Sequence, residues 1–410
     1  MTDIKPDSNA APSDTTGNEA ASSAAQTLLI SLPSLPPDGF KATLANLAQA
    51  FPGDGLLVAT PDAEAVHASA DSPSSLRLLS YTPAAPSSTP WMLTASDYLN
   101  SFKQMQEHHA SACLMLGAES QSLQPAALRA LADAVLTNGV DLSIPHYQLG
   151  ARDGLVNSAI LYPVTRALYG ARPRFPLAID LGLSMRMAER LAATAQRFTA
   201  ISQNNALLWP VAEACATNYA ISEINVGPRT LPPPTLSDLN SLLAQVAGSL
   251  FADVDAKASL WQRSRTLQSV RPPSPAPPSN EPAPDVTPML EAFNLAYTNL
   301  NEIWSLVLPP NSQLALKRLA QMPPENFRMS DSLWARIVYD FILAYRLRTI
   351  NRGHLLGALT PLYLAWVASH FILAASGTSP ERHIEEQAAA FETDKPYLVS
   401  RWRWPDRFNP

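Results

Sequence analysis

The densest group of residues that could bind a ligand lies between positions 152 and 186 of this 410-residue chain. Arginines, an asparagine and two aspartates stand there in an otherwise apolar frame. Guanidinium groups bind carboxylates and phosphates in a bidentate way, and apolar neighbours exclude water, so this mixture is typical of a site for a polar, anionic ligand. The candidate residues are Arg152, Asp153, Asn157, Arg166, Arg172, Arg174 and Asp180.

The local sequence predicts which elements hold these side chains. A turn or helix start at Asp153 is followed by apolar residues at helical spacing. Gly170 predicts the end of that helix, because glycine adopts a positive φ at little cost. A basic loop with Arg172 and Arg174 comes next, and Asp180 then lies in an apolar segment followed by a glycine.

Residues 153–182 read D-G-L-V-N-S-A-I-L-Y-P-V-T-R-A-L-Y-G-A-R-P-R-F-P-L-A-I-D-L-G. This stretch resembles the motif D-G-x-x-x-N-x-x-x-Y-P-x-T-R-A-L-Y-G-x-R-x-R-x-P-x-x-x-D-x-G of family-2-like, GT-A type glycosyltransferases related to glucosyl-3-phosphoglycerate and mannosylglycerate synthases. Two segments between 336 and 408, R-I-V-Y-D-F-I-L-A-Y-R-L-R-T-I-N-R and K-P-Y-L-V-S-R-W-R-W-P-D-R-F, are similar as well.

The resemblance implies transfer of a hexosyl group from a nucleotide sugar to a small polar acceptor, one that carries a carboxylate or a phosphate. It implies a catalytic role for Asp180 and donor-side roles for Asp62 and Glu119. On the acceptor side it matches Asp153, Asn157 and Arg166 to the motif. The arginine cluster completes the expected acceptor-binding set with Arg152, Arg172 and Arg174.

The donor side departs from the family pattern. The resemblance implies Mg²⁺ or Mn²⁺ held by an Asp-x-Asp at a strand end, since a hard cation prefers carboxylate oxygen and bridges phosphates. The chain has Gly117-Ala118-Glu119 there, so Glu119 is the single candidate metal ligand and a metal is disfavoured. The family's late metal-site histidine falls near residues 227–229, which contain no His.

Each candidate also has a structural interpretation. Asp153 fits a helix cap. Arg166 and Asp180 fit an ion pair with each other or with Arg172 or Arg174. Glu119 fits a solvated carboxylate at a strand end. The alternative function is therefore a catalytically inactive relative that binds a sugar or an anion, or serves as a partner protein.

Alternating short apolar strands and helices predict an α/β fold, a GT-A-like Rossmannoid domain with a mostly parallel sheet, followed by an all-α C-terminal domain. Strands are expected near residues 28–32, 55–60, 76–81, 112–116 and 140–145. The expected organisation is a disordered segment 1–25, the GT-A-like domain 26–262, a proline-rich linker 263–288 and the helical domain 289–410.

Composition narrows the functional classes. A net charge of −6 without a basic tract disfavours nucleic-acid binding. The absence of a signal pattern predicts a cytoplasmic protein. Residues 355–375 are apolar enough to span a bilayer, but they stand beside amphipathic helices, so we expect a buried helix and not an integral membrane protein. The expected partners are a nucleotide sugar and a small-molecule acceptor, and the sequence also allows a homodimer.

Overall fold

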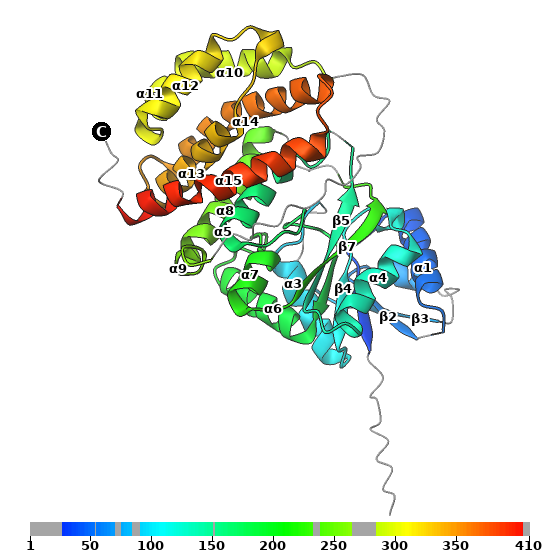
Figure 1. The fold of residues 1–410 in the computed structure, drawn as a ribbon. Helices are drawn as coiled ribbons and strands as arrows, with labels where there is room; N and C mark the ends of the chain where they lie inside the picture. Colours follow the sequence, from blue (N-terminus) through cyan, green and yellow to red (C-terminus); the bar gives the residue numbers. More distant parts are fainter. Residues whose placement is uncertain are drawn as a thin grey trace, which may run out of the picture.

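The computed structural model describes residues 27–53, 55–69, 75–83, 91–150, 152–232, 238–264 and 284–404. A sheet with helices on both faces forms one part of the molecule, and a bundle of helices lies at one end of that part (Figure 1). The predicted segment 1–25 and most of the predicted linker 263–288 lie outside the described residues.

One seven-stranded sheet, in the order β3-β2-β1-β4-β6-β5-β7, forms the centre of the N-terminal part. Paired neighbours are parallel except β6, which is antiparallel to both β4 and β5. β1, β2 and β4 are buried along their whole length, as expected of strands covered on both faces. The strands are β1 (Leu28–Ser31), β2 (Leu56–Thr60), β3 (Leu76–Ser80), β4 (Ala112–Met115), β5 (Leu142–Gln148), β6 (Leu181–Ser184) and β7 (Ile221–Pro228).

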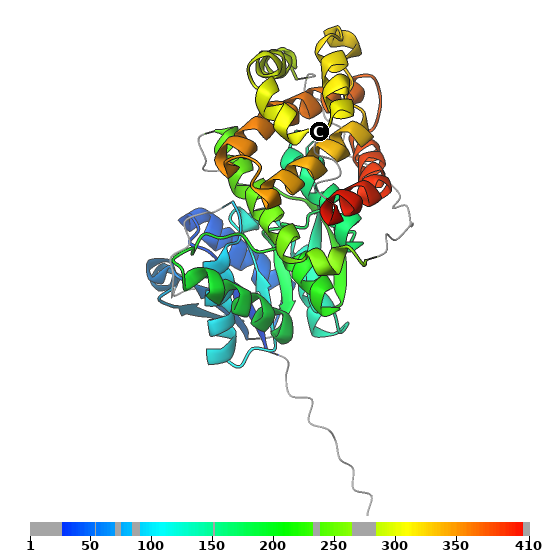
Figure 2. The ribbon, with the colours of Figure 1, turned by 90° about the vertical axis from the view of Figure 1, so that its left-hand side faces the viewer.

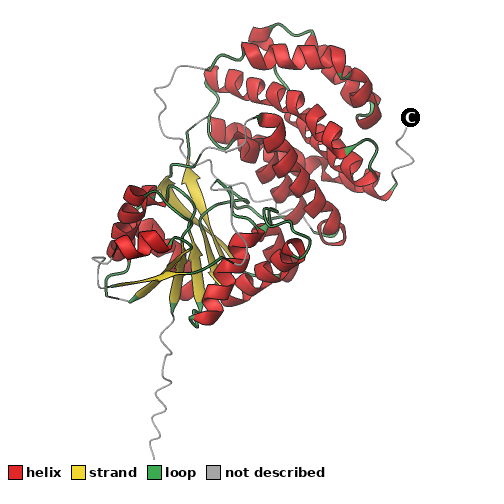
Figure 3. Ribbon diagram, turned by 180° about the vertical axis from the view of Figure 1, so that it is seen from behind, coloured by secondary structure: helices red, strands yellow, loops and turns green. Residues whose placement is uncertain are grey.

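Helices cover both faces of the sheet (Figure 3). α1 (Pro37–Ala50) packs with α4 (Pro125–Leu136), and α3 (Ala95–Glu107) packs with α6 (Met185–Thr199). Thr94 begins α3 with a capping box, in which the Asp97 carboxylate accepts hydrogen bonds from the Thr94 amide and hydroxyl. The shorter helices of this part are α2 (Ala63–Ala68) and α7 (Pro210–Thr217), with a single 3₁₀ turn, η1 (Ser120–Ser122).

The C-terminal helices enclose a second apolar core. Three earlier helices, α5 (Tyr162–Tyr169), α8 (Leu239–Ala256) and α9 (Ala258–Trp261), contribute to the same core, and so does the π-helical turn η2 (Asn157–Leu161) that leads into α5. Figure 2 shows these segments at the junction of the two parts. The C-terminal elements are α10 (Thr287–Asn299), α11 (Asn301–Val307), α12 (Pro310–Ala320), η3 (Pro324–Asn326), α13 (Asp331–Leu347), α14 (Arg352–Ala375) and α15 (Pro380–Arg403).

The predicted α/β architecture with a mostly parallel sheet and a helical C-terminal part is confirmed. The sequence reasoning did not identify β6, because its four residues follow Asp180 and have no alternating pattern of their own. It also gave no strand at 221–228, where β7 carries half-buried polar side chains. α15 continues through Pro396 to Arg403, so the first part of the second similar segment belongs to this helix.

α14 is the apolar segment that has the length and composition to cross a membrane. In this fold, 78% of its most hydrophobic window is buried inside the protein. Its side chains pack in the C-terminal core, among them Trp366, which lies 6.3 Å from Trp334 of α13 between ring centroids. The expectation of a buried helix at residues 355–375 is confirmed.

Candidate functional site

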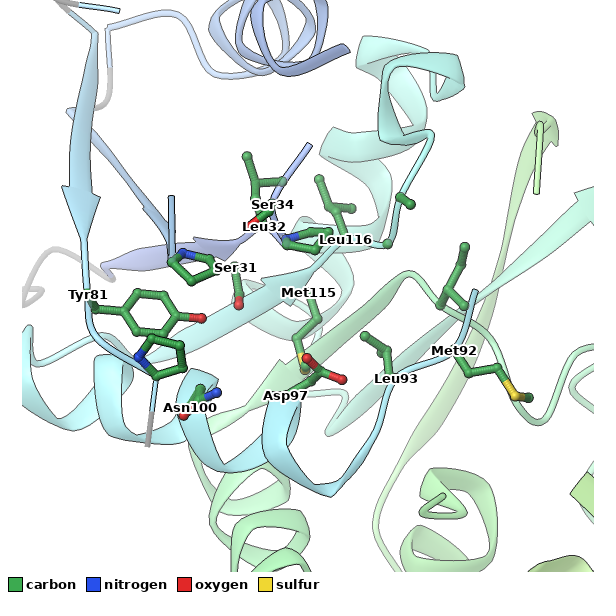
Figure 4. A pocket seen from close by; sticks show the side chains of 16 residues that line it. Ser31, Leu32, Ser34, Tyr81, Met92, Leu93, Asp97, Asn100, Met115 and Leu116 are labelled. Atoms are coloured by element: carbon green, nitrogen blue, oxygen red, sulfur yellow. The ribbon is translucent and has the colours of Figure 1, made fainter. Parts of the chain in front are cut away.

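A cavity of about 450 Å³ opens at the C-terminal edge of the sheet, and we call it the sheet-edge cavity. Its walls come from the residues that end or follow β1, β2, β3 and β4, and from the start of α3 (Figure 4). β1 lies between β2 and β4 in the sheet. The chain therefore adds β2 and β3 on one side of β1 and then places β4 on the other side, which makes a switch point. Ligands of open α/β sheets bind in the crevice beside such a switch point.

Apolar side chains dominate the cavity, and a few polar groups are aimed into it. The Tyr81 hydroxyl and the Asp97 carboxylate point toward its middle, with Asn100 beside them on α3 (Figure 4). Burial, with the charge of Asp97, raises the pKa of Tyr81 above its ordinary value, so the hydroxyl keeps its proton and can donate a hydrogen bond. None of the described lining residues is Lys or Arg.

Asp180 lies behind one wall of this cavity and does not reach into it. Its side chain is fully buried, and its Oδ1 accepts a hydrogen bond from the Gly117 amide at 3.0 Å. Its Oδ2 accepts one from the Tyr147 hydroxyl at 2.8 Å. Gly117 and Ile179 form the wall itself, and a Cβ atom on Gly117 would come within 2.7 Å of the Ile179 side chain.

The partner of Asp180 is Arg229, which follows β7. The Arg229 Nε atom lies 2.9 Å from Asp180 Oδ2, and its Nη2 atom lies 3.2 Å from Oδ1. Burial acts to lower the pKa of Arg229, but the charge and hydrogen bonds of Asp180 raise it above the ordinary value, so the guanidinium stays charged. The guanidinium donates further hydrogen bonds to oxygen atoms of Ala118, Glu119, Ser122 and Thr230.

The residues at the implied metal position do not fit a divalent cation. The Glu119 carboxylate accepts a hydrogen bond from Gln121 Nε2 at 2.7 Å, and Asp180 is paired with Arg229. Across the part of the chain that the structure describes, no group of three or more His, Cys, Asp and Glu side chains could hold a metal. The guanidinium of Arg229 is the cation found beside the carbonyl oxygens of Ala118 and Glu119.

Asp62, the other predicted donor-side residue, is the N-cap of α2. Its Oδ1 atom accepts a hydrogen bond from the Ala65 amide at 2.9 Å. Pro61, directly before it, lines the sheet-edge cavity. Asp62 itself does not line the cavity, and its carboxylate makes a helix-capping contact.

The predicted acceptor-side residues do not line one cleft. Arg152 and Asp153 are exposed, and of the predicted set only Asp153 and Arg174 border the same small pocket, of about 30 Å³. Asn157 donates its side-chain amide to the Arg174 carbonyl at 2.8 Å. Asp180 does not line that pocket; it accepts a hydrogen bond from the Tyr147 hydroxyl and pairs with Arg229.

The arginines of the motif are held by acidic residues of α15. Arg166 is buried and lies 2.6 Å from Glu385 and 3.0 Å from Glu392. Arg174 is buried as well, and its guanidinium lies 3.1 Å from both carboxylate oxygens of Glu381. These contacts join the motif to the helical part. Arg172, half-buried in the loop between them, is not placed in the sheet-edge cavity.

The structure corrects the ion pairing considered from the sequence. Asp180 pairs neither with Arg166 nor with Arg172 or Arg174, because Arg229 reaches it from the end of β7. Sequence reasoning also missed Asp97 and Asn100 of the cavity. The capping pattern at Thr94 and Asp97 was visible, but nothing in it indicated that α3 faces the ends of β1 and β4.

No protein-family model and no curated protein matches this chain. Solved structures do match, among them one described as a mycobacterial protein, with 16% identity over 60% of this chain and 80% of that chain, at a TM-score of 0.37. The glucosyl-3-phosphoglycerate synthase of Mycobacterium tuberculosis in complex with Mn²⁺, UDP-glucose and phosphoglyceric acid has 16% identity over 60% and 84%, with a TM-score of 0.37. Another structure of that synthase has 19% identity over 59% and 86%, at the same TM-score.

Proposed function

We propose that this protein binds a nucleotide sugar in the sheet-edge cavity and transfers its hexosyl group to a small polar acceptor. The observation that carries the proposal is the position of the cavity, at the C-terminal ends of β1, β2 and β4 beside the switch point of the sheet. The motif between Asp153 and Gly182 adds the reaction class, as a resemblance.

The cavity has the size and chemistry of a small-molecule site. Its volume of about 450 Å³ falls within the range of about 300–1,000 Å³ that ligand pockets occupy. Leu32, Leu93 and Met115 offer apolar surface for a base or a sugar face. Tyr81 and Asp97 offer a hydrogen-bond donor and acceptor with which to orient hydroxyl groups.

A catalytically inactive binder is the second candidate, and one specific observation favours it. Asp180, the predicted catalytic residue, is enclosed by Tyr147, Gly117 and Arg229 and does not line the cavity. Arg166 and Arg174, predicted to bind the acceptor, carry ion pairs with α15. A protein that kept the donor cavity and lost turnover would have these features.

One experiment in two stages tests both candidates. Thermal unfolding of the full chain is followed with a panel of nucleoside diphosphates and nucleotide sugars, because a ligand of the folded state raises Tm in a dose-dependent way. Release of nucleoside diphosphate is then measured with carboxylated and phosphorylated acceptors, phosphoglyceric acid included. Binding with product formation supports the transferase, and binding without turnover supports the binder. If no donor raises Tm, the transferase is wrong, and so is an inactive relative that binds the donor.

A further inference from the structure

The group at the implied metal position is a side chain of the protein itself. Six oxygen atoms surround the Arg229 guanidinium within hydrogen-bond distance, and all six are acceptors. Two belong to Asp180, three are backbone carbonyl oxygens, and one is the Ser122 hydroxyl. A shell of carboxylate, carbonyl and hydroxyl oxygens is also what a hard cation prefers.

We propose that the Arg229 guanidinium is the resident cation of this edge of the sheet, so that the sheet-edge cavity binds its nucleotide ligand without a divalent metal. The proposal rests on the proposed function for the identity of the ligand. It goes beyond that function by assigning to Arg229 the place of the metal that the family resemblance implies.

Charge matching supports this assignment. Among the oxygen atoms around Arg229, the only carboxylate that the structure describes is that of Asp180. The side chains of Arg229 and Asp180 are completely buried. A single negative charge balances one guanidinium, whereas a doubly charged ion in its place would leave an uncompensated positive charge in a buried position, which is costly. Glu119 contributes its backbone oxygen to Arg229, while its carboxylate contacts Gln121.

The contacts of Arg229 also connect the cation to the cavity. Its Nη2 atom donates to the Ala118 carbonyl at 2.8 Å, and Ala118 lines the cavity together with Gly117. Gly117 in turn donates its amide to Asp180. The Arg229–Asp180 pair therefore fixes the backbone that follows β4, which is the wall nearest to the cation, in a single conformation without any added ion.

The first test measures nucleotide binding by the full chain. UDP and other nucleoside diphosphates are titrated calorimetrically in buffer with EDTA and again with Mn²⁺. We expect dissociation constants that agree within about twofold, because the resident cation is already in place. Binding that requires Mn²⁺, or is about tenfold tighter with it, overturns this inference while the proposed function stands. If no nucleoside diphosphate binds in either buffer, the proposed function is wrong, and the second test decides on Arg229 alone.

The second test uses Mn²⁺ as the probe, without nucleotide. We expect Mn²⁺ to leave the Tm of the wild-type protein unchanged and to raise the Tm of Arg229→Ala, where the oxygen shell has lost its cation. Arg186→Ala is the matched control, because it removes an arginine from an ion pair with Asp141 away from the cavity. A saturable Mn²⁺ response of the wild-type protein, or an equal response of both variants, contradicts the assignment.

The variant Arg229→Lys covers the case in which Arg229→Ala does not fold. Lysine keeps the positive charge with fewer donors, so we expect a lower Tm than that of the wild type but still no rise with Mn²⁺. A rise in the Tm of Arg229→Lys with Mn²⁺ shows that the side-chain charge does not exclude the ion and overturns the proposal.

Discussion

The Arg166 Nη1 atom lies 2.6 Å from Glu385 Oε2, and this contact joins α5 to the helix that ends the described chain. A second glutamate of α15, Glu392, accepts from Arg166 Nη2 at 3.0 Å. The two glutamates are two helical turns apart, so they lie on one face of α15. The buried guanidinium between them connects the motif region to the helical part.

Replacing Arg166 by Met should destabilise the protein by about 3 kcal/mol, because two mostly buried carboxylates lose their partner. Urea unfolding measures this change. Arg382→Ala is the control: its pair with Glu386 is exposed, and such a pair contributes about 0–1 kcal/mol. Equal stability of the two variants, with nucleotide-sugar turnover lost only in Arg166→Met, would instead restore the acceptor-binding role.

Asp180→Asn should also destabilise the fold, by about 3–5 kcal/mol, because it leaves the buried guanidinium of Arg229 without its counter-charge. Combining it with Arg229→Met should cost less than the sum of the two single changes, since contacting residues couple. A double-mutant cycle in urea measures the coupling. Unchanged stability with complete loss of turnover would show that Asp180 acts in catalysis.

Signals that depend on neighbouring residues were readable from the sequence. Gly170 ends α5 with φ of +68°, as its position predicted. Ser330 is the N-cap of α13, where its side chain accepts a hydrogen bond from the Leu333 amide. Both depend on backbone geometry within one helical turn, which the residue type restricts strongly.

Partners distant in sequence could not be read in the same way. Arg166 finds Glu385 from 219 residues away, and Arg229 finds Asp180 from 49 residues away. A buried charged side chain needs a partner, but the sequence does not say which one, because the fold decides which distant residues come into contact. This is why the motif could be recognised from the sequence while the ion pairs of its arginines with α15 could not be predicted.

Ser34→Trp should close the sheet-edge cavity without disturbing the core, because Ser34 is exposed at its border. We expect nucleotide affinity to fall by about tenfold or more, with Tm changed little. Calorimetric titration with the nucleoside diphosphate that binds the wild type measures the effect. Ser305→Trp, at an exposed position on α11, is the matched control and should bind as the wild type does. Equal affinity of the two variants would place the ligand elsewhere.

His370 should make the protein sensitive to acid. It is buried in the helical part, where its Nδ1 atom lies 2.7 Å from that of His383, and the His383 Nε2 atom lies 3.1 Å from Asp331. Burial, with the charges of His383 and Arg174, lowers the pKa of His370 to about 3. The pKa of His370 is thus lower in the folded state than its ordinary value of 6.5, which holds in the unfolded chain. The contribution of such a group to stability is fully present above pH 6.5 and is lost as pH falls toward 3.

The acid sensitivity caused by His370 must be separated from the effect of Asp340. Burial raises the pKa of Asp340 to about 7, although Arg401 lies beside it. A raised carboxyl pKa acts in the opposite direction, because the folded state then takes up a proton first as pH falls. We therefore compare the wild type with His370→Phe in urea between pH 7.5 and 4.5. The stability lost by the wild type over this range should exceed that of the variant by about 3 kcal/mol, the linkage value for two pH units below the unfolded pKa. Replacement of the exposed His67 by Ala serves as the control. If the free energy of unfolding changes with pH in the same way for the wild type and His370→Phe, then His370 takes up its proton in the folded protein as readily as in the unfolded chain.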